Sequence, residues 1–224
     1  MTAAAHSELM DSVYRRQRHI YDFTRKYYLF GRDRLIRELD LKPGESLVEV
    51  GCGTARNLIK IAQRYPRTML YGLDASAEML KSARVAIERA DLANRIHLAQ
   101  GLAESLSLSD FGRTAPFDRA MFSYSLSMIP DWKQALSGSS RATNPDGIIH
   151  IVDFADLSGL GTLGRKALTA WLTIFHVAPR TEMIEKVQSL MRTKAAERPD
   201  FSMLPAHYAF LLNCTCEEAL ALAS

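Results

Sequence analysis

The chain has 224 residues, of which 47% are hydrophobic and 24% are charged, and its formal net charge is +3. This length is enough for one sizeable domain, and we predict a single domain over residues 1–224. No uncharged stretch is long enough to form a membrane-spanning helix. With three cysteines and no apolar run after Met1, we expect a cytoplasmic protein whose thiols are free.

Residues 1–41 form a basic, tyrosine-rich leader that we expect to be helical. Between positions 14 and 37 there are eight Lys or Arg residues and two Asp residues. Tyrosine and arginine each recur every seven residues, which gives each type its own face if the helix is continuous. Such faces fit either a solvated surface with an aromatic packing stripe or a binding site. The recurring residues are Tyr14, Tyr21 and Tyr28, and Arg18, Arg25 and Arg32.

An acidic residue and two glycines mark the end of the first predicted strand, 47–50. The sequence there is Glu49-Val50-Gly51-Cys52-Gly53-Thr54, and a helix is predicted over 57–62. Glycines let the backbone turn tightly and approach a ligand closely. A dinucleotide-binding loop needs a third small residue where Arg56 stands, and no phosphate-cradling Gly-Lys-Ser/Thr follows. The pattern instead indicates a cofactor whose amino-acid end lies over the loop, and that cofactor is S-adenosylmethionine.

Asp74 ends the second predicted strand, 69–74, and lies 21 positions after Gly53. A carboxylate there can accept two hydrogen bonds from the vicinal hydroxyls of a ribose. Its other interpretation is a helix cap, shared with Ser76, which we expect to begin the next helix. Glu49 either orders the glycine loop and attracts the cofactor's ammonium, or is a strand-end carboxylate bonded to backbone amides. We favour the cofactor interpretation for both carboxylates.

Three more strands, over 96–100, 117–123 and 148–153, continue an alternation of strands and helices from 42 to 156. A turn at 144–147 is expected to begin the last of these strands. The alternation predicts an α/β fold with a doubly wound, mostly parallel sheet and ligands at the carboxyl ends of its strands. We then predict a helical insertion over 157–205, with an apolar helix near 168–175, and a C-terminal segment over 206–224. Residues 208–212 fit either a strand or a helix.

The loop after the third strand reads Gly101-Leu102-Ala103-Glu104-Ser105-Leu106. With the motifs above, it resembles class I S-adenosylmethionine-dependent methyltransferases over roughly residues 45–155, which implies a Rossmann-like fold. That family usually has Asp where this chain has Leu102, so backbone groups would contact the adenine here. The motifs and the resemblance imply cofactor contacts from Tyr28, Arg32, Glu49, Gly51, Cys52, Gly53, Asn57, Asp74, Ala75, Met79, Leu102, Ala103, Glu104 and Ser123.

The leader, residues 14–36, resembles that of bacterial diacylglycerylhomoserine N-methyltransferases, which make a betaine lipid. The resemblance implies three successive methyl transfers to the amine of a lipid headgroup. Aromatic faces suit the cationic product, and arginines suit the headgroup carboxylate. We therefore expect Tyr21 and Tyr124 to be catalytic, and Arg25, Tyr14, His150 and Asp153 to bind substrate; the proton acceptor is left open among Tyr21, Tyr124, His150 and Asp153.

The implied lipid substrate predicts a peripheral protein on the inner face of the cytoplasmic membrane. The basic leader would attract anionic lipid, and the helix near 168–175 either inserts into the membrane or packs as a lid. Three other functions remain open: methylation of phosphatidylethanolamine or of a quinone-like or small-molecule acceptor, and a non-catalytic module that binds a nucleoside or a lipid surface. We expect no nucleic-acid partner and no metal, and the sequence indicates no oligomeric state.

Overall fold

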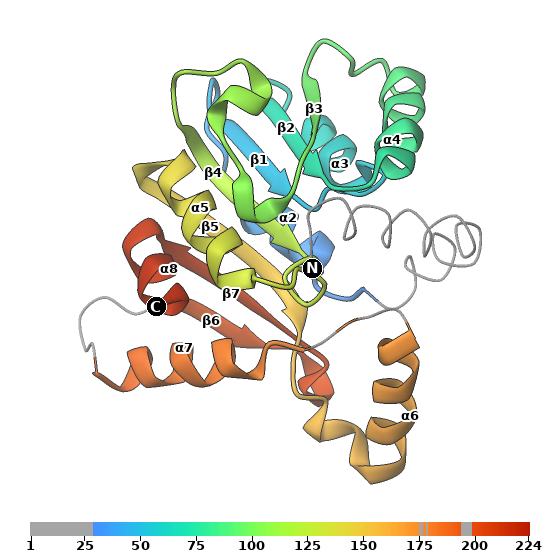
Figure 1. The fold of residues 1–224 in the computed structure, drawn as a ribbon, viewed down its shortest axis with the longest axis vertical. Coiled ribbons are helices and arrows are strands. Elements are labelled where there is room, and N and C mark those ends of the chain that lie inside the picture. The colour runs from blue at the N-terminus through green and yellow to red at the C-terminus, as the bar shows by residue number, and fades with distance from the viewer. Residues whose placement is uncertain (1–28, 175–176, 178, 194–198) are drawn as a thin grey trace.

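A seven-stranded sheet forms the centre of the structure, a computed structural model that describes residues 29–174, 177, 179–193 and 199–224 (Figure 1). The strand order is β3-β2-β1-β4-β5-β7-β6. Strands β1 to β5 run parallel to one another, and β7 is antiparallel to both β5 and β6. The strands are β1 Ser46–Val50, β2 Met69–Asp74, β3 Ile96–Gln100, β4 Phe117–Ser123, β5 Thr143–Phe154, β6 Asp200–Met203 and β7 Ala209–Thr215.

Helices cover both faces of this sheet, because the central strands are apolar on both sides. In β1, for example, Leu47 packs into one hydrophobic cluster while Val48 and Val50 pack into the other. The first cluster includes α2 Arg32–Glu38, α3 Arg56–Arg64 and α4 Ala77–Arg89. The second includes α5 Trp132–Ala142, α7 Thr181–Thr193 and α8 Cys216–Ala223. This arrangement confirms the predicted doubly wound sheet and leaves the carboxyl ends of the parallel strands for a ligand.

The remaining described helix, α6 Gly161–Ile174, belongs to the segment predicted as a helical insertion. It lies at the periphery of the fold in Figure 1, and Leu168 and Leu172 are its described contacts with the first cluster. Four short 3₁₀ turns connect other elements: Ala103–Ser105, Leu108–Phe111, Ser158–Leu160 and Pro205–His207. No helix among the described residues is long and apolar enough to cross a membrane.

Two predicted details differ from the structure. Strand β5 begins at Thr143, so the segment expected as a turn at 144–147 lies inside it. Between two paired positions, Thr143 with Phe117 and Ile148 with Arg119, β5 has three more residues than β4, and this irregularity accounts for the turn-like sequence. The insertion also contains a strand, β6, whose sequence alternates polar and apolar residues. The segment left open between a strand and a helix is a strand from Ala209, where β7 begins.

The leader is not one continuous helix across residues 29–31. Gly31 has φ 84°, a left-handed conformation, and α2 begins after it. The seven-residue spacing of Arg32 from the earlier arginines therefore does not put it on a shared helix face with them. Tyr14, Tyr21, Arg25 and Tyr28, all predicted site residues, lie outside the described residues.

Candidate active site

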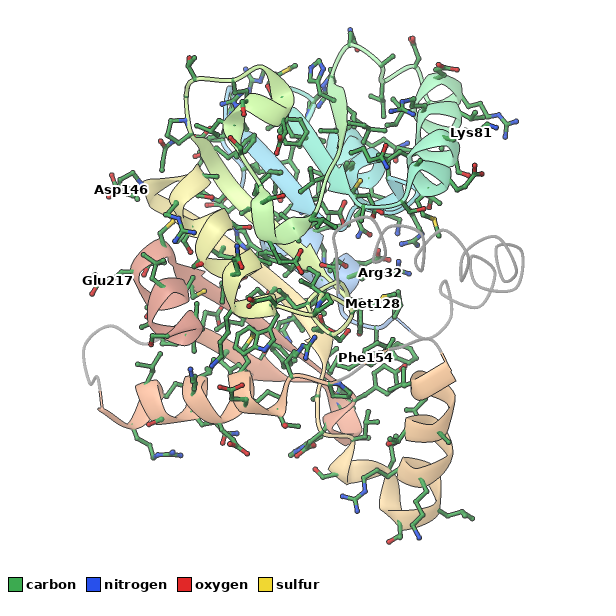
Figure 2. The ribbon with its side chains drawn as sticks, viewed as in Figure 1. Arg32, Lys81, Met128, Asp146, Phe154 and Glu217 are labelled. Carbon is green, nitrogen blue, oxygen red and sulfur yellow. The ribbon has the colours of Figure 1, made fainter. Side chains whose placement is uncertain are left out.

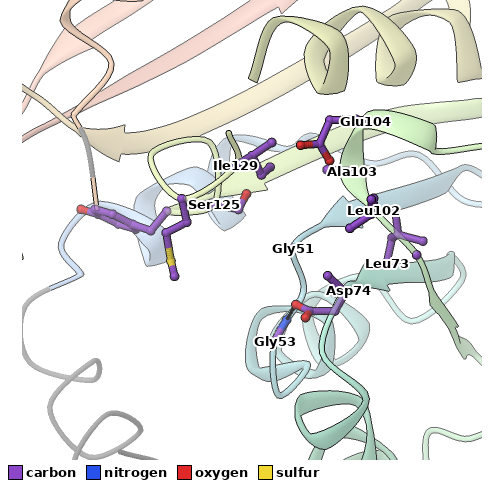
Figure 3. A pocket seen from close by; sticks show the side chains of 13 residues that line it. Gly51, Gly53, Leu73, Asp74, Leu102, Ala103, Glu104, Ser125 and Ile129 are labelled. Carbon is purple, nitrogen blue, oxygen red and sulfur yellow. Dashed lines mark hydrogen bonds between the residues drawn. The ribbon is translucent and has the colours of Figure 1, made fainter. Parts of the chain in front are cut away.

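A cavity lies at the carboxyl ends of β1, β2, β3 and β4. Figure 3 shows its lining, with Ser125 and Ile129 on one side and Asp74 and Gly53 on the other. Eight of the predicted site residues line it: Gly51, Gly53, Asp74, Ala75, Leu102, Ala103, Glu104 and Tyr124. Five further lining residues were not predicted: Leu73, Gly101, Ser125, Met128 and Ile129. Leu73, Gly101 and Ser125 each lie next to a predicted site residue, which is a signal that position alone could have supplied. Met128 and Ile129 lie further along the loop after β4, and no sequence signal marked them.

The glycine loop is held against β2 by its own backbone. The N–H groups of Gly51 and Cys52 donate to the carbonyl of Leu73 over 2.8 and 3.0 Å. Gly51 has φ 79°, and a Cβ built there would lie 2.5 Å from the Cβ of Ser125. The loop therefore needs glycine both for its conformation and for its close approach to the segment after β4. A ligand can approach the bare backbone at this position.

Asp74 joins the glycine loop to the following helix. One carboxylate oxygen accepts the N–H of Gly53 over 2.7 Å and the other accepts the N–H of Ser76 over 2.9 Å. The hydroxyl of Ser76 in turn accepts the N–H of Met79, which confirms the predicted helix cap. An ionised carboxylate can accept several hydrogen bonds at once, so bonds to these two N–H groups do not conflict with a role in binding a ribose. The two interpretations of Asp74 are thus compatible, because the capping bonds orient the carboxylate toward the cavity that it lines.

The loop after β3 gives the cavity an apolar wall. Gly101 donates its N–H to the carbonyl of Asp74 over 3.1 Å, and the 3₁₀ turn at Ala103–Ser105 follows. Leu102 and Ala103 line the cavity, and Glu104 lies beside them (Figure 3). An apolar side chain at Leu102 suits the face of a planar base, while backbone groups of this loop are left to recognise its edge. The lining therefore fits the adenosine part of S-adenosylmethionine.

The segment after β4 forms the opposite wall, with Tyr124, Ser125, Met128 and Ile129. Tyr124 has φ 56°, and its N–H donates to the carbonyl of Val152 on β5. The hydroxyl of Ser125 donates to the carbonyl of Val50 over 2.7 Å, which ties this wall to the end of β1. Figure 2 marks Met128 on this segment and Phe154 at the end of β5. We call residues 124–129 the acceptor wall, because they face the glycine loop across the cavity.

Tyr124 packs as a wall residue, and its hydroxyl is already engaged. It donates to the carbonyl of Phe30 over 2.6 Å, and the side chain is 2% exposed. Burial raises the pKa of this phenol well above its usual value. The raised pKa favours the protonated phenol, whose hydroxyl donates a hydrogen bond in this structure. Its ring stacks edge-on against Phe154, which packs in the same way against Tyr208.

Other predicted cofactor residues support the cavity from behind. Glu49 is 1% exposed and accepts a hydrogen bond from the amide of Asn57 over 2.7 Å, which links β1 to α3. The thiol of Cys52 is buried beside Gly72, and burial raises its pKa well above the usual value. None of the following predicted residues is among the described lining: Arg32, Glu49, Cys52, Asn57, Met79 and Ser123. All six are buried, so their direct contact with the cofactor is not supported.

Asp153 is not in the cavity either, although it was predicted to bind substrate. It is fully buried near the end of β5, and burial raises the pKa of its carboxyl. One carboxylate oxygen of Asp153 accepts the N–H of Ser127 over 3.0 Å, and the other accepts the N–H of the next residue, Phe154, over 2.7 Å. Asp153 therefore holds the acceptor wall in place rather than touching a ligand.

His150 lies in the middle of β5 and lines a different cavity with Arg119, Asp200 and Asn213. Its Nδ1 lies 2.8 Å from Oδ1 of Asn213, whose amide nitrogen donates to Asp200 over 2.9 Å. That arrangement makes Nδ1 the protonated nitrogen of a neutral ring. Burial lowers the pKa of His150 to about 4. The structure therefore places His150 in a cavity other than the one at the carboxyl ends of the parallel strands.

The buried imidazole makes stability depend on pH. Since the folded pKa is about 4 and the unfolded pKa about 6.5, the unfolded chain binds the proton first as pH falls. The titration of His150 alone should therefore lower the free energy of unfolding of wild type by about 3 kcal/mol as the pH falls from about 6.5 to about 4. His150→Leu should reduce the slope of unfolding free energy against pH by up to about 1.4 kcal/mol per unit, measured by urea unfolding at pH 7, 6 and 5. The exposed His97, changed to Gln, is the control; equal slopes in His150→Leu and wild type would contradict the assignment.

Comparison with known proteins agrees with this geometry. Residues 47–147 match a family model described as a methyltransferase domain. A demethylmenaquinone methyltransferase from Geobacillus stearothermophilus is 31% identical over 146 residues, 65% of this chain and 56% of that protein. One from Desulfitobacterium hafniense is 28% identical over 141 residues, 60% of this chain and 54% of that protein. The chain thus spans little more than half the length of these relatives.

Two solved structures show the same fold at low sequence identity. The methyltransferase SibL has a TM-score of 0.62 at 17% identity, over 88% of this chain and 56% of that one. A phosphoethanolamine N-methyltransferase of Haemonchus contortus, in complex with S-adenosyl-L-methionine, has a TM-score of 0.60 at 17% identity. That match covers 77% of this chain and 38% of the other. At this identity the likeness concerns the fold alone.

Proposed function

We propose that this chain, whose residues 47–147 match a methyltransferase domain and whose fold is Rossmann-like, transfers a methyl group from S-adenosylmethionine to a quinone-like or other largely apolar acceptor. S-adenosylmethionine supplies an electrophilic methyl on a sulfonium. The single observation that carries the proposal is the cavity between the glycine loop and the acceptor wall. It has a carboxylate placed for a ribose on one side and an aromatic and aliphatic surface on the other.

The residues of the cavity suit transfer by positioning. Asp74 and the loop at Gly101–Glu104 would bind the nucleoside, and the backbone at Gly51–Gly53 would lie beside its amino-acid end. Tyr124 and Met128 offer polarisable surface that suits both a sulfonium and an aromatic ring. A carbon or nitrogen nucleophile of the acceptor would take the methyl, the electron pair of the broken bond would remain on sulfur, and the acceptor would lose a proton. Such an in-line displacement is accelerated largely by alignment of the two reactants.

The choice of acceptor rests on the lining and on the relatives. No charged side chain is among the four lining residues of the acceptor wall, whereas a homoserine headgroup carries a carboxylate. Of the leader arginines, Arg32 is buried and is not among the lining residues of the cavity, and Arg25, which was predicted to bind substrate, lies outside the described residues. The relatives are named demethylmenaquinone methyltransferases, and a quinone ring of that kind suits an apolar wall. Conversion of diacylglyceryl-homoserine to a betaine lipid remains the alternative, supported by the leader at 14–36.

A competition between acceptors tests the proposal. The full chain is incubated with methyl-labelled S-adenosylmethionine and mixed micelles that contain reduced demethylmenaquinone, diacylglyceryl-homoserine or phosphatidylethanolamine. The extracted products are analysed by mass spectrometry. We expect one added methyl on the quinone and none on either lipid amine. Successive methylation of the homoserine lipid alone would overturn the quinone proposal in favour of the betaine lipid, and cofactor binding without any product would support a non-catalytic module.

We also propose that the protein docks on anionic membranes through α6, since these acceptors reside in bilayers. Leu163 is 84% exposed, its neighbours Arg165 and Lys166 are exposed, and no acidic residue occurs from 157 to 180. Each cation near an anionic surface contributes about 1 kcal/mol. Changing Leu163, Arg165 and Lys166 to Ser, Gln and Gln should lower flotation with phosphatidylglycerol-rich vesicles by at least about tenfold. The control Arg84→Gln, an exposed change on α4, should not; equal flotation of both variants would refute docking by α6.

A further inference from the structure

The acceptor wall is held from two distant parts of the chain. From β5, the carboxylate of Asp153 accepts the N–H of Ser127 over 3.0 Å. From the start of α7, Arg180 donates from Nε to the carbonyl of Leu126 over 2.9 Å and from Nη2 to the carbonyl of Ile129. The wall residues Met128 and Ile129 thus lie on a stretch of backbone whose carbonyls are bound by one guanidinium.

The guanidinium is chemically suited to this position. It presents several N–H groups in a rigid planar fork, so one side chain can bind two carbonyls of a turn at once. A lysine ammonium is a point donor without that geometry. Arg180 is half-buried, and burial lowers the pKa of its guanidinium, while the nearby carboxylate of Asp153 opposes that shift. A guanidinium nevertheless stays protonated in proteins. The charge is therefore retained at a site where two hydrogen bonds to it are strong.

We propose that Arg180 is a positioning residue that sets the acceptor side of the cavity. Arg180 is not among the lining residues of the cavity, and it acts through the backbone of residues 126–129 on the positions of Met128 and Ile129. The segment between β5 and β6 would then influence acceptor choice without itself lining the cavity. The predicted effect on the KM for the acceptor rests on the proposed methyl transfer. The predicted effect on the acceptor wall does not, because Arg180 binds its backbone in the free protein.

The first test measures backbone protection, with no acceptor present. Arg180→Gln and Arg180→Lys are compared with wild type by amide hydrogen exchange. We expect exchange in the peptide that covers residues 124–130 to speed up by about tenfold or more in Arg180→Gln, because two charge-assisted hydrogen bonds are lost. The peptide that covers residues 49–56 should be unchanged. Arg192→Gln, an exposed change on the same helix, is the control and should match wild type in both peptides.

The second test separates acceptor binding from cofactor binding. We expect Arg180→Gln to raise the KM for the acceptor about tenfold while the Kd for S-adenosylmethionine, measured by calorimetry, stays within about twofold. Arg180→Lys should recover only a small part of the loss. Unchanged exchange at 124–130, or equal losses of acceptor and cofactor affinity, would overturn the role of Arg180. If wild type methylates no acceptor, the proposed function fails, and the exchange measurement still decides the role of Arg180.

Discussion

Replacing Asp74 by Ala should weaken S-adenosylmethionine binding by about 100-fold or more, because two hydrogen bonds from the ribose to a charged acceptor are lost. The change also removes the acceptors for the N–H groups of Gly53 and Ser76, so the loop loses its link to α4. Asp74→Asn retains one acceptor oxygen and should lie between wild type and Asp74→Ala. Calorimetry with S-adenosylmethionine and with S-adenosylhomocysteine gives the affinities, and urea unfolding gives the stability of each variant.

The control for this prediction is Glu88→Gln, which removes a carboxylate from an exposed position of α4. It should bind the cofactor as wild type does. If Asp74→Ala retained full affinity while folded, the ribose would not lie at the end of β2, and the assignment of the whole cavity would be wrong.

Gly51→Ala should abolish detectable cofactor binding and destabilise the fold. Alanine at φ 79° is strained, and its Cβ would lie 2.5 Å from the Cβ of Ser125. Overpacking of this kind costs about 1–3 kcal/mol beyond the backbone strain. Either the glycine loop or the acceptor wall must shift, and the cavity between them changes in both cases. Urea unfolding and calorimetry measure the two effects.

Gly44→Ala separates the strain from the contact. Gly44 has φ 91°, and nothing lies within 4 Å of a Cβ built there. Left-handed backbone strain should lower the free energy of unfolding of both variants by about 1–2 kcal/mol. Only Gly51→Ala should be destabilised further and lose cofactor binding. Similar unfolding free energies and unimpaired binding in the two variants would show that the close approach at Gly51 is unimportant.

The parts of the site that could be predicted from the sequence are those set by local backbone chemistry. Gly51, Gly53 and Asp74 lie at strand ends, where a parallel sheet brings successive loops to one edge. A short apolar run predicts each strand, and the neighbouring glycines predict each turn, so a few consecutive residues suffice. For this reason the five parallel strands, and the positions of the loops at Gly51 and Leu102 at their ends, could be predicted. The same local signal indicated the cap at Ser76.

The predictions that failed depended on which face of a strand a side chain occupies. His150 and Asp153 both belong to the predicted strand 148–153, but His150 lines another cavity and Asp153 accepts a hydrogen bond from a backbone amide of the acceptor wall. The strand residues give no periodicity that separates these faces, because β5 is buried along most of its length. The role of Arg180 could not be predicted either, since its partners lie more than 50 residues earlier in the chain.

The most direct test of the account is a crystal structure of the protein with S-adenosylhomocysteine. We expect the ribose hydroxyls within hydrogen-bond distance of Asp74, the adenine against Leu102 and Ala103, and the amino-acid end over Gly51–Gly53. The sulfur should then point toward the acceptor wall, where a methyl group would meet its acceptor. A nucleoside bound elsewhere, or a sulfur directed away from residues 124–129, would contradict the account.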